Sequence, residues 1–173
     1  MPKDGALVPE GEPEMIVSGF PQQQSHASKA FTFDNKGNLY VAVGAPSNAC
    51  QTEERTPGSP GIEPCPLLEE HGGIWRFDAN KTNQTFSAAA RYATGLRNVV
   101  GLDWNTTADA LFVMQHGRDQ LHTLWPDFYT EEESAELPAE SMYEVKEGDR
   151  FSWPYGYYDY LKKMLMLSPE YGG

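Results

Sequence analysis

Positive charge is scarce in this chain of 173 residues. Lysine and arginine together number 13, against 25 aspartates and glutamates, which gives a formal net charge of −12. Nucleic acids and anionic membrane surfaces bind proteins through basic patches, so neither is an expected partner. A run of about 18 apolar residues, as a spanning helix requires, is also missing, and the N-terminus has no apolar stretch typical of a signal peptide.

Cysteine is nearly absent, since the chain has only Cys50 and Cys65. They lie in a long loop rich in proline and glycine, residues 45–70, and a loop of this length in a compact domain is usually functional or mobile. A disulfide between them is predicted for an oxidising compartment, and two free thiols are the alternative. In the chain-entropy account, such a bond stabilises the fold by roughly 3 kcal/mol.

Long runs of helix-forming residues are missing as well, whereas 16 glycines and 13 prolines are present. This composition favours short strands and loops over helices. The aromatic content of 12% and charged content of 22% are typical of a globular protein. We therefore expect a single domain over residues 1–173, with a loop or disordered start at residues 1–14.

Two stretches predict β-hairpins of the same type. Residues 29–44 (KAFTFDNKGNLYVAVG) contain two short apolar runs joined by a turn at 34–38, and residues 93–119 repeat the pattern around a turn at 105–109. The start of the first strand and the end of the second lie at the same end of a hairpin. Residues that flank each hairpin should therefore be neighbours in space.

Further strands are predicted at residues 15–17, 73–78 and 85–94, and another at 121–125, whereas the acidic residues 127–140 predict a solvated loop. Four strands followed by a second, similar hairpin are typical of a β-propeller. The predicted fold is all-β, a β-propeller fragment with about one complete four-stranded blade and parts of its neighbours. The ring is not closed, so the chain is expected to be a piece of a larger protein; a β-sandwich is the alternative.

A propeller would gather the loops that flank both hairpins at one mouth. These loops carry His26, residues 44–48, Arg97 with Asn98, and residues 115–119. A sandwich requires no such convergence. The grouped imidazole, guanidinium and main-chain oxygens would suit a small anionic or polar ligand.

Four segments in order resemble the glucose/sorbosone dehydrogenase family. After His26 they read KAFTFDNKGNLYVAVG, TGLRNVVGLDW, LFVMQHGRDQL and EGDRFSWPYGYYD. The family consists of soluble six-bladed propellers that use pyrroloquinoline quinone and calcium. The resemblance implies a quinone-dependent oxidoreductase acting on the CH–OH group of a sugar or sugar aldehyde, with an external electron acceptor and an extracellular or periplasmic location.

The resemblance also implies roles for individual residues. His26 is similar to the general base, Arg97 to the arginine that polarises the quinone carbonyl receiving hydride, and Asn98 to a neighbour that contacts the cofactor. Gly117 and Arg118 are similar to the pair whose backbone carbonyls hold calcium against the quinone, which also makes Arg118 a cofactor-binding candidate. Asp119 is expected to orient Arg97 or to serve calcium indirectly.

These residue types suit that chemistry. An imidazole with an ordinary pKa near 6.5 can accept a proton at neutral pH, a guanidinium stays charged, and calcium prefers oxygen ligands. The alternative function is a non-catalytic β-propeller that binds carbohydrate or protein and has lost the cofactor.

Overall fold

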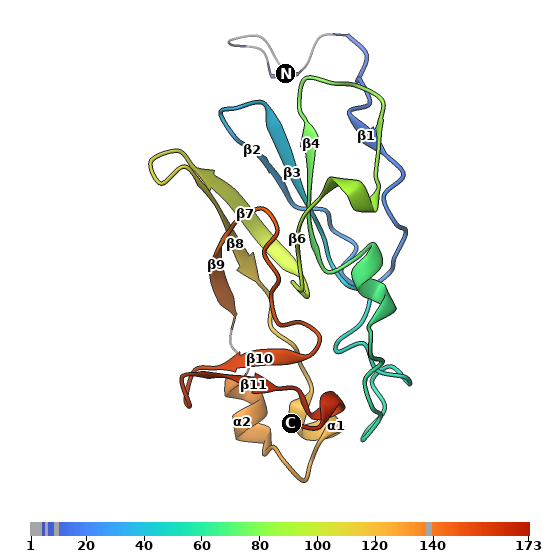
Figure 1. Cartoon of the computed structure of the whole chain (residues 1–173), viewed down its shortest axis with the longest axis vertical. Helices are drawn as coiled ribbons and strands as arrows, with labels where there is room; N and C mark the ends of the chain where they lie inside the picture. Colours follow the sequence, from blue (N-terminus) through green and yellow to red (C-terminus); the bar gives the residue numbers. More distant parts are fainter. Residues whose placement is uncertain (1–4, 6, 9–10, 138–139) are drawn as a thin grey trace.

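The structure is a computed structural model that describes residues 5, 7–8, 11–137 and 140–173 (Figure 1). Part of the predicted loop or disordered start at residues 1–14 lies outside the described residues, and residues 11–14 form neither helix nor strand. The strands are β1 (Val17–Ser18), β2 (Phe31–Phe33), β3 (Asn38–Val43), β4 (Gly73–Asp78), β5 (Gln84–Thr85), β6 (Arg91–Thr94), β7 (Val99–Asn105), β8 (Ala110–Gln115), β9 (Ser141–Val145), β10 (Gly156–Asp159) and β11 (Met164–Leu167).

Helices are few and short in the described part of the chain. They are the α-helices α1 (Leu121–Leu124) and α2 (Glu131–Glu136) and the 3-10 helices Pro66–Glu69, Ala88–Ala90 and Pro169–Tyr171. Among residues 11–137 and 140–173, none of the helices has the length and apolar character needed to cross a bilayer.

The first sheet is a four-stranded antiparallel blade in the order β2-β3-β4-β6. Its central strand β3 is apolar on both faces because both faces are covered. Leu39, Val41 and Val43 pack with Trp75 and other residues into a core on one side of the sheet. Tyr40 belongs to a second core on the other side.

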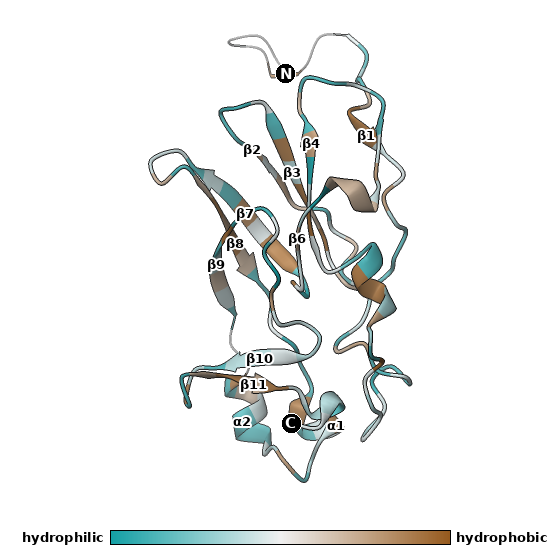
Figure 2. Cartoon of the chain, viewed as in Figure 1, coloured by the Kyte–Doolittle hydropathy of each residue, from teal (hydrophilic) through white to brown (hydrophobic). Residues whose placement is uncertain are grey.

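The second sheet, β7-β8-β9, packs against this second face, and the two sheets lie side by side (Figure 1). Leu111, Val113 and Val145 share one core with Tyr40, and the ring of Tyr40 stacks on Trp104 with centroids 5.6 Å apart. Brown, apolar segments are visible on β3, β7 and β8, and also outside these two sheets on β11 (Figure 2). The predicted all-β fold, with one complete four-stranded blade and part of the next in an open ring, is confirmed.

The strand predictions for the two hairpins and for residues 73–78 are confirmed as β2–β3, β7–β8 and β4. The strand expected at residues 85–94 is confirmed only at Arg91–Thr94, because Ala88–Ala90 forms a 3-10 turn and Gln84–Thr85 pairs in parallel with β1. β1 itself begins later than predicted, at Val17.

Two expectations for the segment after β8 are wrong. The strand expected at residues 121–125 is instead the helix α1 at Leu121–Leu124, because Leu121 and Leu124, three positions apart, bury the same helical face. The acidic segment contains α2, which begins with a capping box: Thr130 Oγ1 accepts from the Glu133 amide, and the Glu133 carboxylate accepts from the Thr130 amide. Residues 138–139 of the predicted loop lie outside the described residues.

The predicted disulfide joins Cys50 to Cys65, with Cα atoms 6.2 Å apart. It packs with Ala45 and Trp153 in a small buried cluster. The long loop is thereby fixed to the end of β3 and to the C-terminal segment.

The contact between the sheets predicts a large difference between a buried and an exposed position of β8. Leu111→Ala should lower the free energy of unfolding by about 2–5 kcal/mol, because Leu111 is fully buried between the sheets. Met114→Ala, on the exposed face of the same strand, should cost less than about 1 kcal/mol. Urea denaturation measures both, and equal losses would contradict this packing.

Candidate functional site

The loops at one end of the two hairpins come together. The Ala45 amide donates to the Arg97 carbonyl at 2.7 Å, and the His116 amide donates to the Asn98 carbonyl at 2.8 Å. Gly44 lies so close to its neighbours that an added Cβ would be 2.8 Å from both His26 Cβ and Asn98 Oδ1. The structure therefore places His26, Arg97 and Asn98 at one mouth, as hairpin geometry predicts.

His26 is held by its own loop and by the end of β3. The Gln23 side-chain amide donates to the main-chain carbonyls of Ser25, His26 and Gly44, each at 2.9 Å. His26 has a left-handed backbone, with φ of 51°. Its Nδ1 lies 2.5 Å from the Ala45 carbonyl oxygen. Because a carbonyl can only accept, Nδ1 carries the proton and Nε2 keeps its lone pair in the neutral ring.

The surroundings of His26 favour this neutral form. Burial lowers the pKa of the imidazole below its usual value, and the positive charge of Arg97 lowers it further. The hydrogen bond to Ala45 and the negative charge of Asp119 act in the opposite direction without reversing the shift. At neutral pH His26 is therefore a proton acceptor.

Arg97 follows β6 and is almost completely buried, with 1% of its surface exposed. Its guanidinium donates to three acceptors: Nε to the Asn48 carbonyl at 3.2 Å, Nη1 to the Gly117 carbonyl at 2.5 Å and Nη2 to Asp119 Oδ2 at 3.4 Å. Burial lowers the pKa of Arg97 to about 10, and Asp119 partly offsets this effect. The side chain is thus a fixed positive charge at neutral pH.

Asp119 lies between two arginines. Its Oδ1 accepts from Arg55 Nη1 at 2.8 Å, and its Oδ2 faces Arg97. Burial alone would raise the pKa of this carboxyl, but the hydrogen bond from Arg55 and the charge of Arg97 outweigh burial, and the net pKa is lowered. Asp119 therefore stays ionised and contacts Arg97, the arrangement expected of a residue that orients it.

Gly117 and Arg118 are engaged by other parts of the protein. The Gly117 carbonyl accepts from Arg97, and the Arg118 guanidinium forms a two-point ion pair with the buried Glu170 at 2.6 Å for each contact. Trp125 Nε1 also donates to Glu170, at 2.9 Å. Both terminal nitrogens of Arg118 are therefore paired with Glu170, whereas its buried Nε has no hydrogen-bond partner, and the oxygen that this residue can offer a ligand is its backbone carbonyl.

The oxygen donors at Gly117 and Arg118 are of the kind that calcium prefers. Among the described residues no group of three or more His, Cys, Asp or Glu side chains could hold a metal. A calcium ion here would therefore depend on main-chain carbonyls, one of which already accepts from a buried cation. For a quinone, the fixed positive charge of Arg97 suits a carbonyl that gains negative charge.

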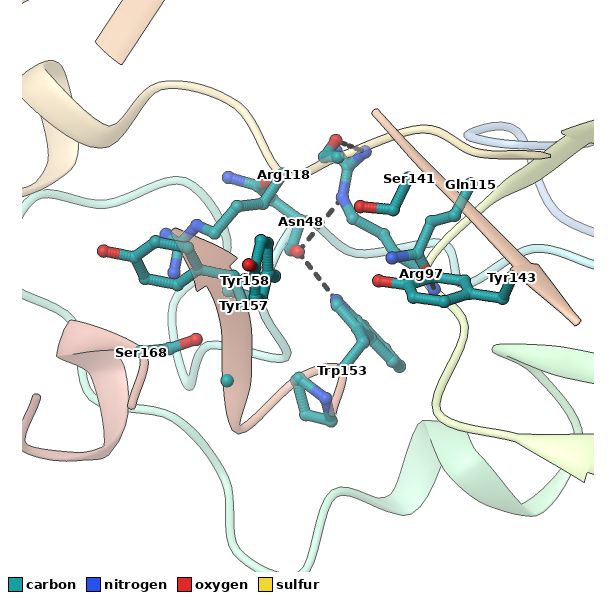
Figure 3. A pocket seen from close by; sticks show the side chains of 14 residues that line it. Asn48, Arg97, Gln115, Arg118, Ser141, Tyr143, Trp153, Tyr157, Tyr158 and Ser168 are labelled. Carbon is teal, nitrogen blue, oxygen red and sulfur yellow. Dashed lines mark hydrogen bonds between the residues drawn. The ribbon is translucent and has the colours of Figure 1, made fainter. Parts of the chain in front are cut away.

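Two cavities border the mouth. A narrow one of about 20 Å³, enough for about one water molecule, lies among Asn48, Arg97, Arg118 and Trp153 (Figure 3). A wider hollow of about 370 Å³ lies beside residues 116–119 and α2. The wider one falls within the range of small-molecule sites.

Four residues that organise the mouth were missed or given no role from the sequence: Gln23, Asn48, Arg55 and Trp153. Asn48 was placed at the mouth by the hairpin geometry, but its hydrogen bonds depend on loops far apart in the chain. Arg55 reaches Asp119 from the disulfide loop, and no spacing rule connects those positions.

Two of the solved structures that match this chain show its fold. The pyranose dehydrogenase PQQ domain from Coprinopsis cinerea superposes with a TM-score of 0.59 at 16% identity, covering 85% of this chain and 36% of that one. A Trichoderma reesei protein of Carbohydrate-Active Enzymes Family AA12 superposes with a TM-score of 0.58 at 15% identity, covering 84% and 35%. This chain therefore shares its fold with part of each of these two proteins.

The chain spans about a third of the length of the solved structures that it matches. Identity this low establishes a shared fold and leaves activity to be argued from the site. No protein-family model and no curated protein matches the sequence.

The environment of His26 predicts its titration. Its ring should titrate below the ordinary value of about 6.5, because burial and Arg97 disfavour the imidazolium, and its neutral form should carry the proton on Nδ1. Nitrogen-15 NMR of the imidazole measures both properties. Because the pKa is lowered on folding, the unfolded state binds more protons near pH 6, so His26 should favour unfolding as the pH falls through this range. A ring protonated on Nε2, or a raised pKa, would contradict this geometry.

Proposed function

We propose that this chain is part of a quinone-dependent oxidoreductase that acts on the CH–OH group of a sugar or sugar aldehyde. The observation that supports this most directly is the meeting of a neutral imidazole, His26, with a buried guanidinium, Arg97, at one mouth. The fold shared with a pyranose dehydrogenase PQQ domain supports the same proposal.

In this proposal His26 Nε2 takes the proton from the substrate hydroxyl. Arg97 would stabilise negative charge on the oxygen of the quinone carbonyl, and Asn98 would contact the cofactor. The Gly117 and Arg118 carbonyls would hold calcium. The substrate carbon would give its hydride to bound pyrroloquinoline quinone, and an external acceptor would take up the electrons.

The proposed setting is extracellular or periplasmic. The disulfide between Cys50 and Cys65 supports an oxidising compartment. A small sugar or aldehyde is the proposed substrate, and the net charge of −12 disfavours nucleic acid as a partner.

Dye reduction tests the role of His26. A full-length protein that contains this chain, reconstituted with pyrroloquinoline quinone and calcium, should reduce a dye in the presence of an aldose, and His26→Ala should lower turnover by roughly 10²- to 10⁴-fold. His71→Ala is the matched control, because His71 is also half-buried with a pKa lowered by burial, and it has no place in the proposed site. Wild-type turnover in His26→Ala would remove the basis of the proposal.

The alternative is a non-catalytic propeller that has lost the cofactor and binds carbohydrate or protein. The hydrogen bond from Arg97 to the Gly117 carbonyl and the ion pair of Arg118 with Glu170 favour this alternative, because both guanidinium groups already contact protein acceptors. Calcium-dependent binding of the quinone, seen as a shift in visible absorbance, separates the two functions. A full-length protein that binds no quinone would support the alternative.

The contact between Arg97 and the Gly117 carbonyl also predicts how calcium affinity responds to substitution. Arg97→Met should bind calcium more tightly than the wild type, because a cation no longer contacts a proposed ligand oxygen. Arg55→Met is the matched control, since Arg55 is a nearby cation that pairs with Asp119 instead. Calorimetry measures both affinities, and an equal gain in the two variants would point to general electrostatics instead of the Gly117 contact.

A further inference from the structure

Asn48 is a fully buried asparagine just beyond the end of β3, and all of its polar groups form hydrogen bonds. Its main-chain amide donates to Glu54 Oε1 at 2.8 Å. The remaining bonds reach segments that are distant in the chain. A buried amide satisfied in this way specifies one arrangement of its neighbours, because losing any partner leaves a buried polar atom unpaired.

The Asn48 side chain forms a two-point contact with the main chain of Asp119. Nδ2 donates to the Asp119 carbonyl at 2.8 Å, and Oδ1 accepts from the Asp119 amide at 3.1 Å. The contact joins the loop after β3 to the loop after β8, which are separated by 71 residues. It therefore fixes the backbone that carries the Asp119 carboxylate.

The Asn48 main-chain carbonyl contacts Arg97, which forms an ion pair with Asp119. It accepts from Arg97 Nε at 3.2 Å and from Trp153 Nε1 at 2.9 Å, as the dashed lines in Figure 3 show. One residue thus sets the position of the Arg97 guanidinium through its backbone and that of Asp119 through its side chain.

We propose that Asn48 is a positioning residue of the site. It holds Arg97 and Asp119 in fixed positions relative to each other, so that the Arg97 guanidinium keeps one direction at the mouth. The inference deepens the proposed function and rests on it. Asparagine suits this position because one amide supplies both a donor and an acceptor to the Asp119 backbone. Aspartate would lack the donor, and alanine would lack both.

Amide hydrogen exchange tests the geometry without any cofactor. Asn48→Ala should speed exchange of the Asp119 amide at least about tenfold, because its acceptor is removed. Asn105→Ala is the matched control: Asn105 Oδ1 also accepts two main-chain amides, those of Thr107 and Ala108, but at the opposite end of the β7–β8 hairpin. Unchanged exchange at Asp119 in Asn48→Ala would overturn the proposal.

Quinone affinity tests whether Asn48 acts through Arg97. Asn48→Ala should weaken quinone binding about tenfold, which corresponds to about 1.4 kcal/mol, whereas Leu111→Ala should lower stability and leave the affinity within about twofold. In an Arg97→Met background, Asn48→Ala should cause no further loss, because the group that Asn48 positions is absent.

The outcomes separate the two proposals. An additive loss in the double variant, or wild-type affinity in Asn48→Ala, would overturn the positioning role. A full-length wild-type protein that binds no quinone would overturn the proposed function, and the exchange rate at Asp119 would then decide the role of Asn48 in holding the mouth together.

Discussion

The mouth of this protein depends on the burial of one positive charge. Arg97 is almost completely removed from water, and an isolated buried cation is costly unless protein groups replace its hydration. Two carbonyls and one carboxylate do so: the Asn48 carbonyl comes from the loop after β3, and the Gly117 carbonyl and the Asp119 carboxylate come from the loop after β8. The need to satisfy this guanidinium therefore explains why the loops after β3 and β8 meet at the end of β6.

The same charge determines the chemistry of its surroundings. It helps to lower the pKa of His26, which keeps the imidazole neutral, and it helps to keep Asp119 ionised. A proton acceptor, a fixed cation and a carboxylate thus share a small volume. This combination suits an oxidation that removes a proton from one side of a substrate while negative charge develops on a neighbouring oxygen.

The two sheets supply the rigidity that this arrangement requires. Each β-hairpin begins and ends at the mouth, and the hairpins pack against each other through Tyr40, Trp104 and the buried residues of β8. Two further segments contact the loop after β8. The disulfide loop does so through the ion pair of Arg55 with Asp119, and the C-terminal segment does so through the ion pair of Glu170 with Arg118. The site is therefore built on loops whose ends are fixed by strands.

The sequence alone determined the hairpins, because alternating apolar residues around polar turns leave a strand few other ways to bury one face. It also predicted the Cys50–Cys65 disulfide and, through hairpin geometry, the grouping of His26, Arg97 and residues 115–119. The helices after β8 were missed, since α1 has only four residues and a single apolar pair at helical spacing.

Tertiary structure alone decided what each polar group at the mouth contacts. Hydrogen bonds at the mouth join residues 20 to 105 positions apart in the chain. They include those of Arg97 with Gly117, of Arg118 with Glu170 and of Trp153 with Asn48. A hydrogen bond depends on distances within a few tenths of an ångström and on direction, and no local pattern in the chain encodes either across such separations.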